Sequence, residues 1–116
     1  MTMTEDELVD ECYDLSYVEF LILYYADGKK SKTQLMNELI EKYGDIIEHG
    51  PYLYGEYSDD IDEGVDQLCS FGILHRNKYK LERTESGQKM LEIMLSNIWI
   101  FDEDVEKAIK RVKEAE

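Results

Sequence analysis

Residues 58–91 decide the fold, and they read SDDIDEGVDQLCSFGILHRNKYKLERTESGQKML. The first part predicts a helix, because four apolar residues recur at helical spacing and form one stripe. These residues are Ile61, Val65, Leu68 and Cys69. Ser58 is a suitable N-cap, and Gly72 suits the left-handed turn that ends many helices. Glycine inside a helix costs about 1 kcal/mol relative to alanine, and we interpret Gly64 as a point where another helix crosses closely.

Two short strands are predicted after this helix. Residues 73–76 and 79–83 alternate in character on either side of Asn77 and Lys78, which indicates a tight hairpin. Thr84 can then cap a further helix. A helix followed by a hairpin and another helix is the core of a winged helix. We therefore expect a mainly α protein with a small β wing: a winged helix-turn-helix domain with an additional C-terminal helix.

Two more helices are predicted before this stretch. Residues 15–26, LSYVEFLILYYA, have Glu19 as their only charge and are apolar on nearly all sides, which is typical of a helix buried by its domain. After a lysine-rich turn, a second helix opens at Ser31 with capping-box spacing and closes at Gly44. Residues 45–57 are predicted to form a loop with at most one strand, whose tyrosines either roof the core or stack on an exposed base.

The length and composition of the chain suit one domain, since it has 116 residues of which 43% are hydrophobic. We divide it into an acidic N-terminal arm (1–14) that is expected to fray, a winged-helix domain (15–91) and a C-terminal helical extension (92–116). No early stretch combines basic residues with a long apolar run, so we expect no membrane association and a cytoplasmic protein. Cys12 and Cys69 lie far apart in sequence and are expected to be reduced thiols.

The net charge of -14 is unevenly distributed along the chain. Residues 45–72 carry -8, whereas residues 28–44 carry +2 and residues 73–90 carry +3. A duplex-binding protein usually has a basic footprint on one face, so the overall charge opposes strong nonspecific DNA binding. The second helix and the wing are nevertheless basic islands on an acidic chain.

One segment resembles a known family. Residues 52–74, YLYGEYSDDIDEGVDQLCSFGIL, resemble the YwgA-like winged-helix proteins of archaea and bacteria. The pattern of that family is an aromatic residue, then Tyr-Gly-Pro-Tyr-Ser, then a helix that ends in Gly-Leu-Ile. The matching residues are Tyr54, Gly55, Tyr57 and Ser58. Glu56 replaces the proline of the pattern.

A second, shorter motif adds to this resemblance. Residues 84–87, TESG, are similar to the Thr-x-x-Gly that follows the wing in many such regulators, although Arg83 stands where leucine is usual. Together the two motifs extend the resemblance over residues 15–91. It implies a winged-helix fold and a regulatory or nucleic-acid-binding role, and it supplies no catalytic residues.

The first functional hypothesis is contact with double-stranded DNA through the basic wing. The helix that begins at Ser58 would enter the major groove in a conventional winged helix, but its five carboxylates would repel phosphate. We therefore expect contact through the wing and through the lysines before the second helix. The candidate nucleic-acid-binding residues are Lys29, Lys30, Lys32, Arg76, Lys78, Lys80 and Arg83. The alternative is that these are solvated charges that balance acidic neighbours.

The second functional hypothesis is an acidic protein-interaction module, or a nucleic-acid mimic, with no DNA binding of its own. The carboxylates of the same helix would face a basic protein partner, and salt would weaken the attraction. The candidate protein-interaction residues are Asp59, Asp62, Glu63 and Asp66. The alternative is that this face only makes the protein soluble.

The C-terminal extension is predicted to form a homodimer. Residues 90–101, MLEIMLSNIWIF, are too apolar for a helix that shows one face to a monomer core, and an amphipathic helix follows them. The candidate dimer residues are Ile98, Trp99, Phe101, Val105, Ile109 and Val112. The alternative is that Trp99 and Phe101 fold back onto the first helix.

The sequence predicts no enzymatic activity. No serine, cysteine or lysine has the neighbours that activate a nucleophile, and the sequence has no Gly-rich phosphate loop. His49 and His75 have no carboxylate or cysteine at a known ligand spacing. We therefore expect neither a metal ion nor another cofactor.

Overall fold

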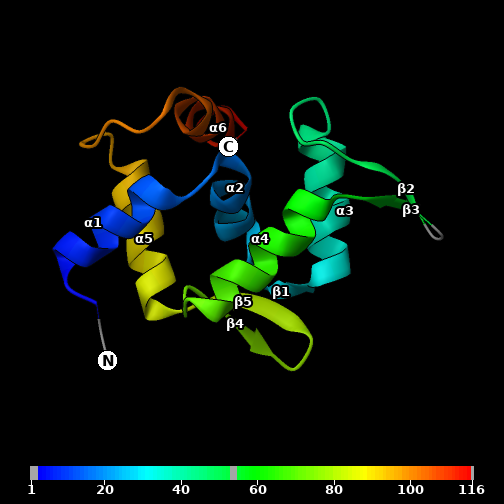
Figure 1. Cartoon of the computed structure of the whole chain (residues 1–116), viewed down its shortest axis with the longest axis horizontal. Coiled ribbons are helices and arrows are strands. Elements are labelled where there is room, and N and C mark those ends of the chain that lie inside the picture. The colour runs from blue at the N-terminus through cyan, green and yellow to red at the C-terminus, as the bar shows by residue number, and fades with distance from the viewer. Residues whose placement is uncertain (1–2, 53–54, 116) are drawn as a thin grey trace.

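The computed structural model describes residues 3–52 and 55–115. Within these residues the chain is mainly helical, with a three-stranded antiparallel sheet and a separate two-stranded hairpin (Figure 1). In chain order the elements are α1 (Glu5–Asp14), α2 (Tyr17–Tyr25), β1 (Asp27–Ser31), α3 (Lys32–Tyr43), β2 (Gly50–Tyr52), β3 (Gly55–Tyr57), α4 (Asp59–Ser70), β4 (Leu74–Asn77), β5 (Lys80–Arg83), α5 (Glu85–Leu95) and α6 (Glu103–Glu114). Tyr54, which carries part of the family resemblance, lies outside the described residues.

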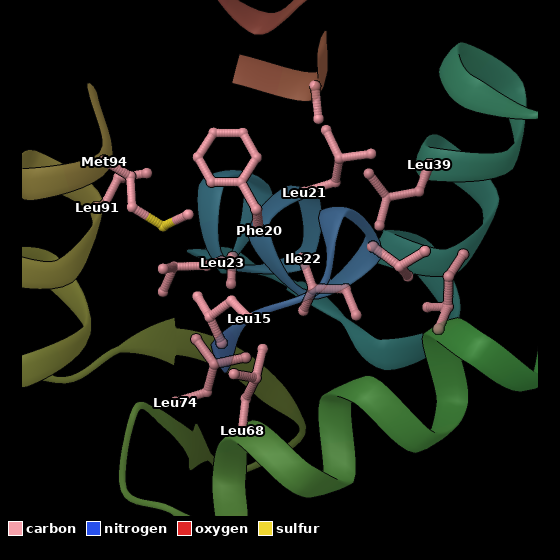
Figure 2. Close-up of a cluster of buried hydrophobic side chains, with 14 of the residues drawn as sticks. Leu15, Phe20, Leu21, Ile22, Leu23, Leu39, Leu68, Leu74, Leu91 and Met94 are labelled. Carbon is pink, nitrogen blue, oxygen red and sulfur yellow. The ribbon is translucent and has the colours of Figure 1, made fainter. Parts of the chain in front are cut away.

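Helix α2 forms the centre of the core. Its residues Phe20, Leu21, Ile22 and Leu23 are all fully buried. Figure 2 shows these side chains directed to several sides of α2, among apolar residues of α3, α4 and α5. Although α2 is apolar all round, neither it nor another helix in the described part of the chain has the length and apolarity needed to cross a membrane.

Helix α4 begins and ends where the sequence predicts. The hydroxyl of Ser58 accepts a hydrogen bond of 3.3 Å from the backbone N–H of Ile61. At the other end Gly72 has a φ of 74°, and the N–H of Ile73 donates to the carbonyl oxygen of Leu68 at 2.9 Å. This left-handed ending satisfies a carbonyl group that the helix leaves unpaired.

The predicted close crossing at Gly64 is confirmed. Helix α4 packs against α2, and a Cβ added to Gly64 would lie 2.7 Å from Cδ1 of Ile22. Any larger residue would therefore push the two helices apart or displace a fully buried side chain. Glycine at this position lowers the intrinsic stability of the helix, but it allows α2 and α4 to pack closely.

The three-stranded sheet has the order β1-β5-β4. The predicted hairpin is present, but its turn lies one residue later than predicted. Asn77 pairs with Lys80 at the end of β4, so the two turn residues are Lys78 and Tyr79 instead of Asn77 and Lys78, with Lys78 at a φ of 63°. Strand β1 corrects the expectation of a lysine-rich turn, because its residues pair antiparallel with β5. Its sequence, DGKKS, has no β-branched or aromatic residue, so local propensity does not indicate a strand.

The tyrosine-rich insert contains two strands where at most one is predicted. Strands β2 and β3 pair antiparallel, with Gly50 opposite Tyr57 and Pro51 opposite Glu56. The hairpin lies at one end of the long axis of the molecule (Figure 1).

The expectation that the N-terminal arm frays is corrected for residues 4–14, since residues 1–2 lie outside the described residues. Thr4 and Glu7 form a capping box, in which the N–H of Glu7 donates to the Thr4 hydroxyl at 3.3 Å and the N–H of Thr4 donates to a Glu7 carboxylate oxygen at 3.1 Å. Leu8, Val9 and Cys12 are buried, and α1 packs against α5. Three apolar residues on one face are enough to hold a short helix once it docks on a neighbour.

The structure corrects most of the predicted dimer surface. Helix α6 packs against α2, and four of the six candidate dimer residues are buried in the core of their own chain. These four are Phe101, Val105, Ile109 and Val112. The Phe101 ring lies 5.0 Å from the ring of Tyr13 in α1, so this residue folds back onto the domain. An amphipathic stripe shows that a helix face is covered, but it does not show which chain covers it.

The Thr-x-x-Gly motif joins the end of α4 to the start of α5. The Thr84 hydroxyl accepts from the N–H of Gly87 at 3.1 Å and lies 2.7 Å from the carbonyl oxygen of Gly72, to which it can donate. A Cβ added to Gly87 would overlap the carbonyl oxygen of Ile73. The motif therefore needs a capping hydroxyl followed, three residues later, by a residue without a side chain.

We expect Gly87→Ala to lower the free energy of unfolding by about 1–3 kcal/mol, because the methyl group would meet a backbone carbonyl that cannot move alone. Urea unfolding followed by circular dichroism measures this change. Gly50→Ala is the matched control, because a Cβ there meets no atom of the described residues within 4 Å. The control should change the free energy by less than about 0.5 kcal/mol, and an equal effect of both variants would contradict the overlap at Gly87.

Candidate interaction surface of α4 and the β4–β5 hairpin

The outer face of α4 presents carboxylates because its inner face is apolar. Ile61, Val65 and Leu68 point into the core. The four candidate protein-interaction residues are spaced by three, one and three positions, which places them on one side of a helix. They are Asp59, Asp62, Glu63 and Asp66. The helix therefore offers a continuous acidic face to its surroundings.

Part of this acidic face is paired with basic residues of the same chain. Lys32, the first residue of α3, forms ion pairs with Asp62 and with Asp66, the latter at 3.2 Å. Nη2 of Arg76, in β4, donates to Asp66 at 2.9 Å. We call these four residues the Asp66 cluster. It links α4 to α3 and to the β4–β5 hairpin.

The pKa values in the Asp66 cluster follow from these contacts. The hydrogen bond from Lys32 and a second one from Tyr57 lower the pKa of Asp62. The hydrogen bond from Arg76, followed by that from Lys32, lowers the pKa of Asp66. Both carboxyl groups are therefore held in the charged form.

Arg83 has a structural role, which corrects its assignment as a phosphate contact. Its Nη1 donates to the carbonyl oxygens of Leu23 at 2.9 Å and Tyr24 at 2.8 Å, and its Nε donates to Gln88 at 2.8 Å. These bonds tie β5 to the end of α2, and burial lowers the pKa of the guanidinium. The arginine at this position thus links β5, α2 and α5.

Lys30 is also engaged within the chain. Its ammonium lies 3.2 Å from Asp27 and 2.8 Å from Glu38, and it donates to the carbonyl oxygen of Tyr25 at 3.3 Å. Contact with a phosphate would require this lysine to leave two carboxylates. Four of the seven candidate nucleic-acid-binding residues are therefore bound within the chain and not directly available to phosphate. They are Lys30, Lys32, Arg76 and Arg83.

Three lysines remain exposed: Lys29, Lys78 and Lys80. In the residues that the structure describes, no carboxylate lies within ion-pairing distance of them. Ser31 pairs with Lys80 in the sheet, so the lysines of β1 and of the β4–β5 hairpin belong to one small surface. Of the seven candidate nucleic-acid-binding residues, these three are the ones whose side chains have neither an ion pair nor a hydrogen bond among the described residues, and we call them the residual basic site.

An acidic recess of about 320 Å³ adjoins the start of α4. Its lining residues are Glu48, His49, Gly50, Tyr57, Asp59 and Asp60. Over residues 3–52 and 55–115, no lysine or arginine pairs with Glu48, Asp59 or Asp60. Sequence reasoning did not select Glu48, because only the fold of the insert brings it beside α4.

A metal site is not formed by these carboxylates or by the histidines. Nδ1 of His49 lies 3.3 Å from Glu56, and Nε2 of His75 lies 4.0 Å from Glu82. Among the described residues, no three side chains of His, Cys, Asp or Glu are grouped so as to hold a metal ion.

In comparisons with known proteins, no family model, curated protein or solved structure matches this chain.

We expect Lys32→Met to raise the pKa of Asp62 toward that of an ordinary aspartate, as measured by NMR titration of the carboxyl carbon. Since the folded-state pKa of Asp62 is lowered, its contribution to stability is present above the unfolded pKa and is lost as the pH falls through the folded pKa. The loss at neutral pH should be only about 0.5 kcal/mol, because both side chains are about one-third exposed and solvent screens the pair.

The matched control is Lys107→Met, since Lys107 pairs with Glu103 on the surface of α6. It should leave the titration of Asp62 unchanged. An Asp62 pKa that is the same in the parent and in Lys32→Met would contradict the role of Lys32 in the Asp66 cluster.

Proposed function

We propose that this chain is a winged-helix protein whose acidic α4 face binds a basic surface of another protein. The order of its elements supports the winged-helix assignment: helix α2, strand β1, helices α3 and α4, and then the β4–β5 hairpin as the wing. The strand order β1-β5-β4 places the wing beside β1. The resemblance to the YwgA-like proteins points in the same direction.

One observation carries the proposal: the helix that would read the major groove presents a row of carboxylates to solvent. Asp59 and Glu63 are exposed, and no described lysine or arginine pairs with them. Carboxylates in this position repel phosphate and attract cations. The acidic recess beside Asp59 gives room for a lysine or arginine side chain of the partner.

The Asp66 cluster supports the same proposal. It pairs Lys32 and Arg76 with carboxylates of α4 and thereby keeps these two basic residues from phosphate groups. It also holds the acidic face in a fixed position between α3 and the wing. A preorganised charged face loses little conformational freedom when it binds.

A regulator that touches DNA through its wing is the second candidate. The observation that favours it is the residual basic site of Lys29, Lys78 and Lys80. Three lysines can neutralise about three phosphates, which supports weak and salt-sensitive binding. The surrounding net charge of -14 opposes it.

We expect an oligoarginine peptide to bind the parent chain and to bind more weakly as NaCl rises from about 50 to 500 mM, because salt screens exposed charges. Asp59→Asn combined with Glu63→Gln should weaken binding about threefold to tenfold, as the loss of two exposed ion pairs predicts. Isothermal titration calorimetry measures the affinities.

The matched control for the peptide experiment is Glu85→Gln combined with Glu103→Gln, which removes the same charge from α5 and α6. Its affinity should stay within about twofold of the parent value. An equal loss of affinity in both double variants would show that binding depends only on the net charge of the chain. It would contradict the assignment of the peptide site to α4.

If the wing holds DNA, the affinity for a duplex should fall with salt at a logarithmic slope of about -3, since each of three lysines neutralises about one phosphate. Fluorescence anisotropy with a labelled duplex measures this slope.

The test variant for DNA binding replaces Lys29, Lys78 and Lys80 by Gln and should lose binding. The control replaces Lys89, Lys107 and Lys110 by Gln and should retain it. Absence of parent binding at about 50 mM NaCl would eliminate the DNA candidate.

A further inference from the structure

The connection between α5 and α6 exposes three consecutive apolar residues, which we call the apolar turn. Ile98 is 75% exposed, Trp99 is 38% exposed and Ile100 is 84% exposed. The next residue, Phe101, is buried. Figure 1 shows this connection projecting at the end of the molecule opposite the β2–β3 hairpin.

The apolar turn is held at both ends. Before it, Asn97 has a φ of 64°, and its side-chain oxygen accepts from the ammonium of Lys113 at 2.6 Å. After it, the N–H of Phe101 donates to a carboxylate oxygen of Glu106 at 2.8 Å. Asparagine tolerates the left-handed conformation better than most residues. The two isoleucines are therefore presented by a fixed backbone.

A groove of about 400 Å³ lies beside the apolar turn, between α1 and α5. Its apolar lining residues are Met3, Leu8, Ile93, Ile98 and Trp99. Glu5, Lys89 and Glu92 add charges of both signs to its lining. The same face thus carries a projection and a recess of matching chemistry.

We propose that a second copy of this chain covers this face, with Ile98 and Ile100 of each copy entering the groove of the other. A two-fold symmetric interface requires one patch to be complementary to itself, and a projection beside a recess meets that requirement. Lys89 of one copy can face Glu5 or Glu92 of the other across the groove. The proposed interface thus keeps Ile98 and Trp99 from the sequence-based dimer prediction, adds Ile100 and the groove, and leaves out the four residues that are buried in their own chain.

The exposed area agrees with a weak dimer. The apolar turn together with half-exposed Tyr13 leaves on the order of 500 Å² of side chain in water per chain. This is the size of the largest apolar patch on a typical monomer, and such patches are often interaction sites. Two copies would bury on the order of 1,000 Å², the lower limit of specific interfaces. Interfaces of this size are typical of weak association, and salt should strengthen it, since two chains of charge -14 repel each other.

Sedimentation equilibrium from about 1 to 500 µM tests the proposal, because this range brackets the affinity expected of such an interface. The parent mass should rise from 13.7 kDa toward twice that value, and more readily at about 500 mM than at about 50 mM NaCl. Ile98→Asp and Ile100→Asp should each weaken association at least about tenfold, because each replaces a buried apolar contact by a charge beside the apolar lining residues of the groove.

Phe71→Asp is the matched control, since Phe71 is 57% exposed at the end of α4, outside the proposed interface. It should associate like the parent. Circular dichroism checks that every variant keeps its helices. A parent that stays at 13.7 kDa throughout, or a dimer that only Phe71→Asp disrupts, would overturn the proposal. If the chain stays monomeric and co-sediments with phosphatidylcholine vesicles, the proposed dimer is wrong and the apolar turn binds a lipid surface instead.

Discussion

The four consecutive buried residues of α2, from Phe20 to Leu23, need an apolar covering in every direction around the helix axis. That covering comes from α3, α4, α5 and α6. Each covering helix must turn its own apolar stripe inward, so its other residues form the face that contacts solvent. For α4 the remainder is acidic, and for α6 it is a mixed charged surface. The burial of α2 thus determines both the core and the chemistry of the outer surface.

The joint between α4 and α5 connects this arrangement to the β4–β5 hairpin. The Thr84 hydroxyl bonds to the carbonyl oxygen of Gly72 and to the N–H of Gly87, and the backbone of Ile73 lies so close to Gly87 that a side chain would not fit there. Arg83, next to this joint, is bonded to the end of α2. The hairpin is therefore anchored at its base, and Arg76 reaches Asp66 from β4. As a result, part of the basic charge of the β4–β5 hairpin neutralises a carboxylate of α4 and is not free to bind a ligand.

Two surfaces of different physical character result. In the proposed function the acidic face of α4 would act through charge, whose influence salt reduces. In the proposed dimer the apolar turn between α5 and α6 would act through burial of hydrocarbon, which salt favours when it screens the repulsion between like-charged chains. Figure 1 shows α4 in the middle of the molecule and the connection between α5 and α6 at one end, so the two proposed surfaces belong to different parts of the fold.

The sequence by itself determined the elements whose signals are local. The ends of α4, the close crossing at Gly64 and the β4–β5 hairpin follow from caps, helical spacing and strand alternation, which act over a few residues. The acidic face of α4 also follows from its spacing. Only the tertiary structure decided that α1 docks on α5 and that DGKKS forms a strand with β5. The same holds for the carbonyl oxygens that Arg83 binds and for the inward orientation of the α6 stripe. These outcomes depend on partners tens of residues away, and a one-dimensional pattern of polar and apolar residues shows that a surface is buried without showing what buries it.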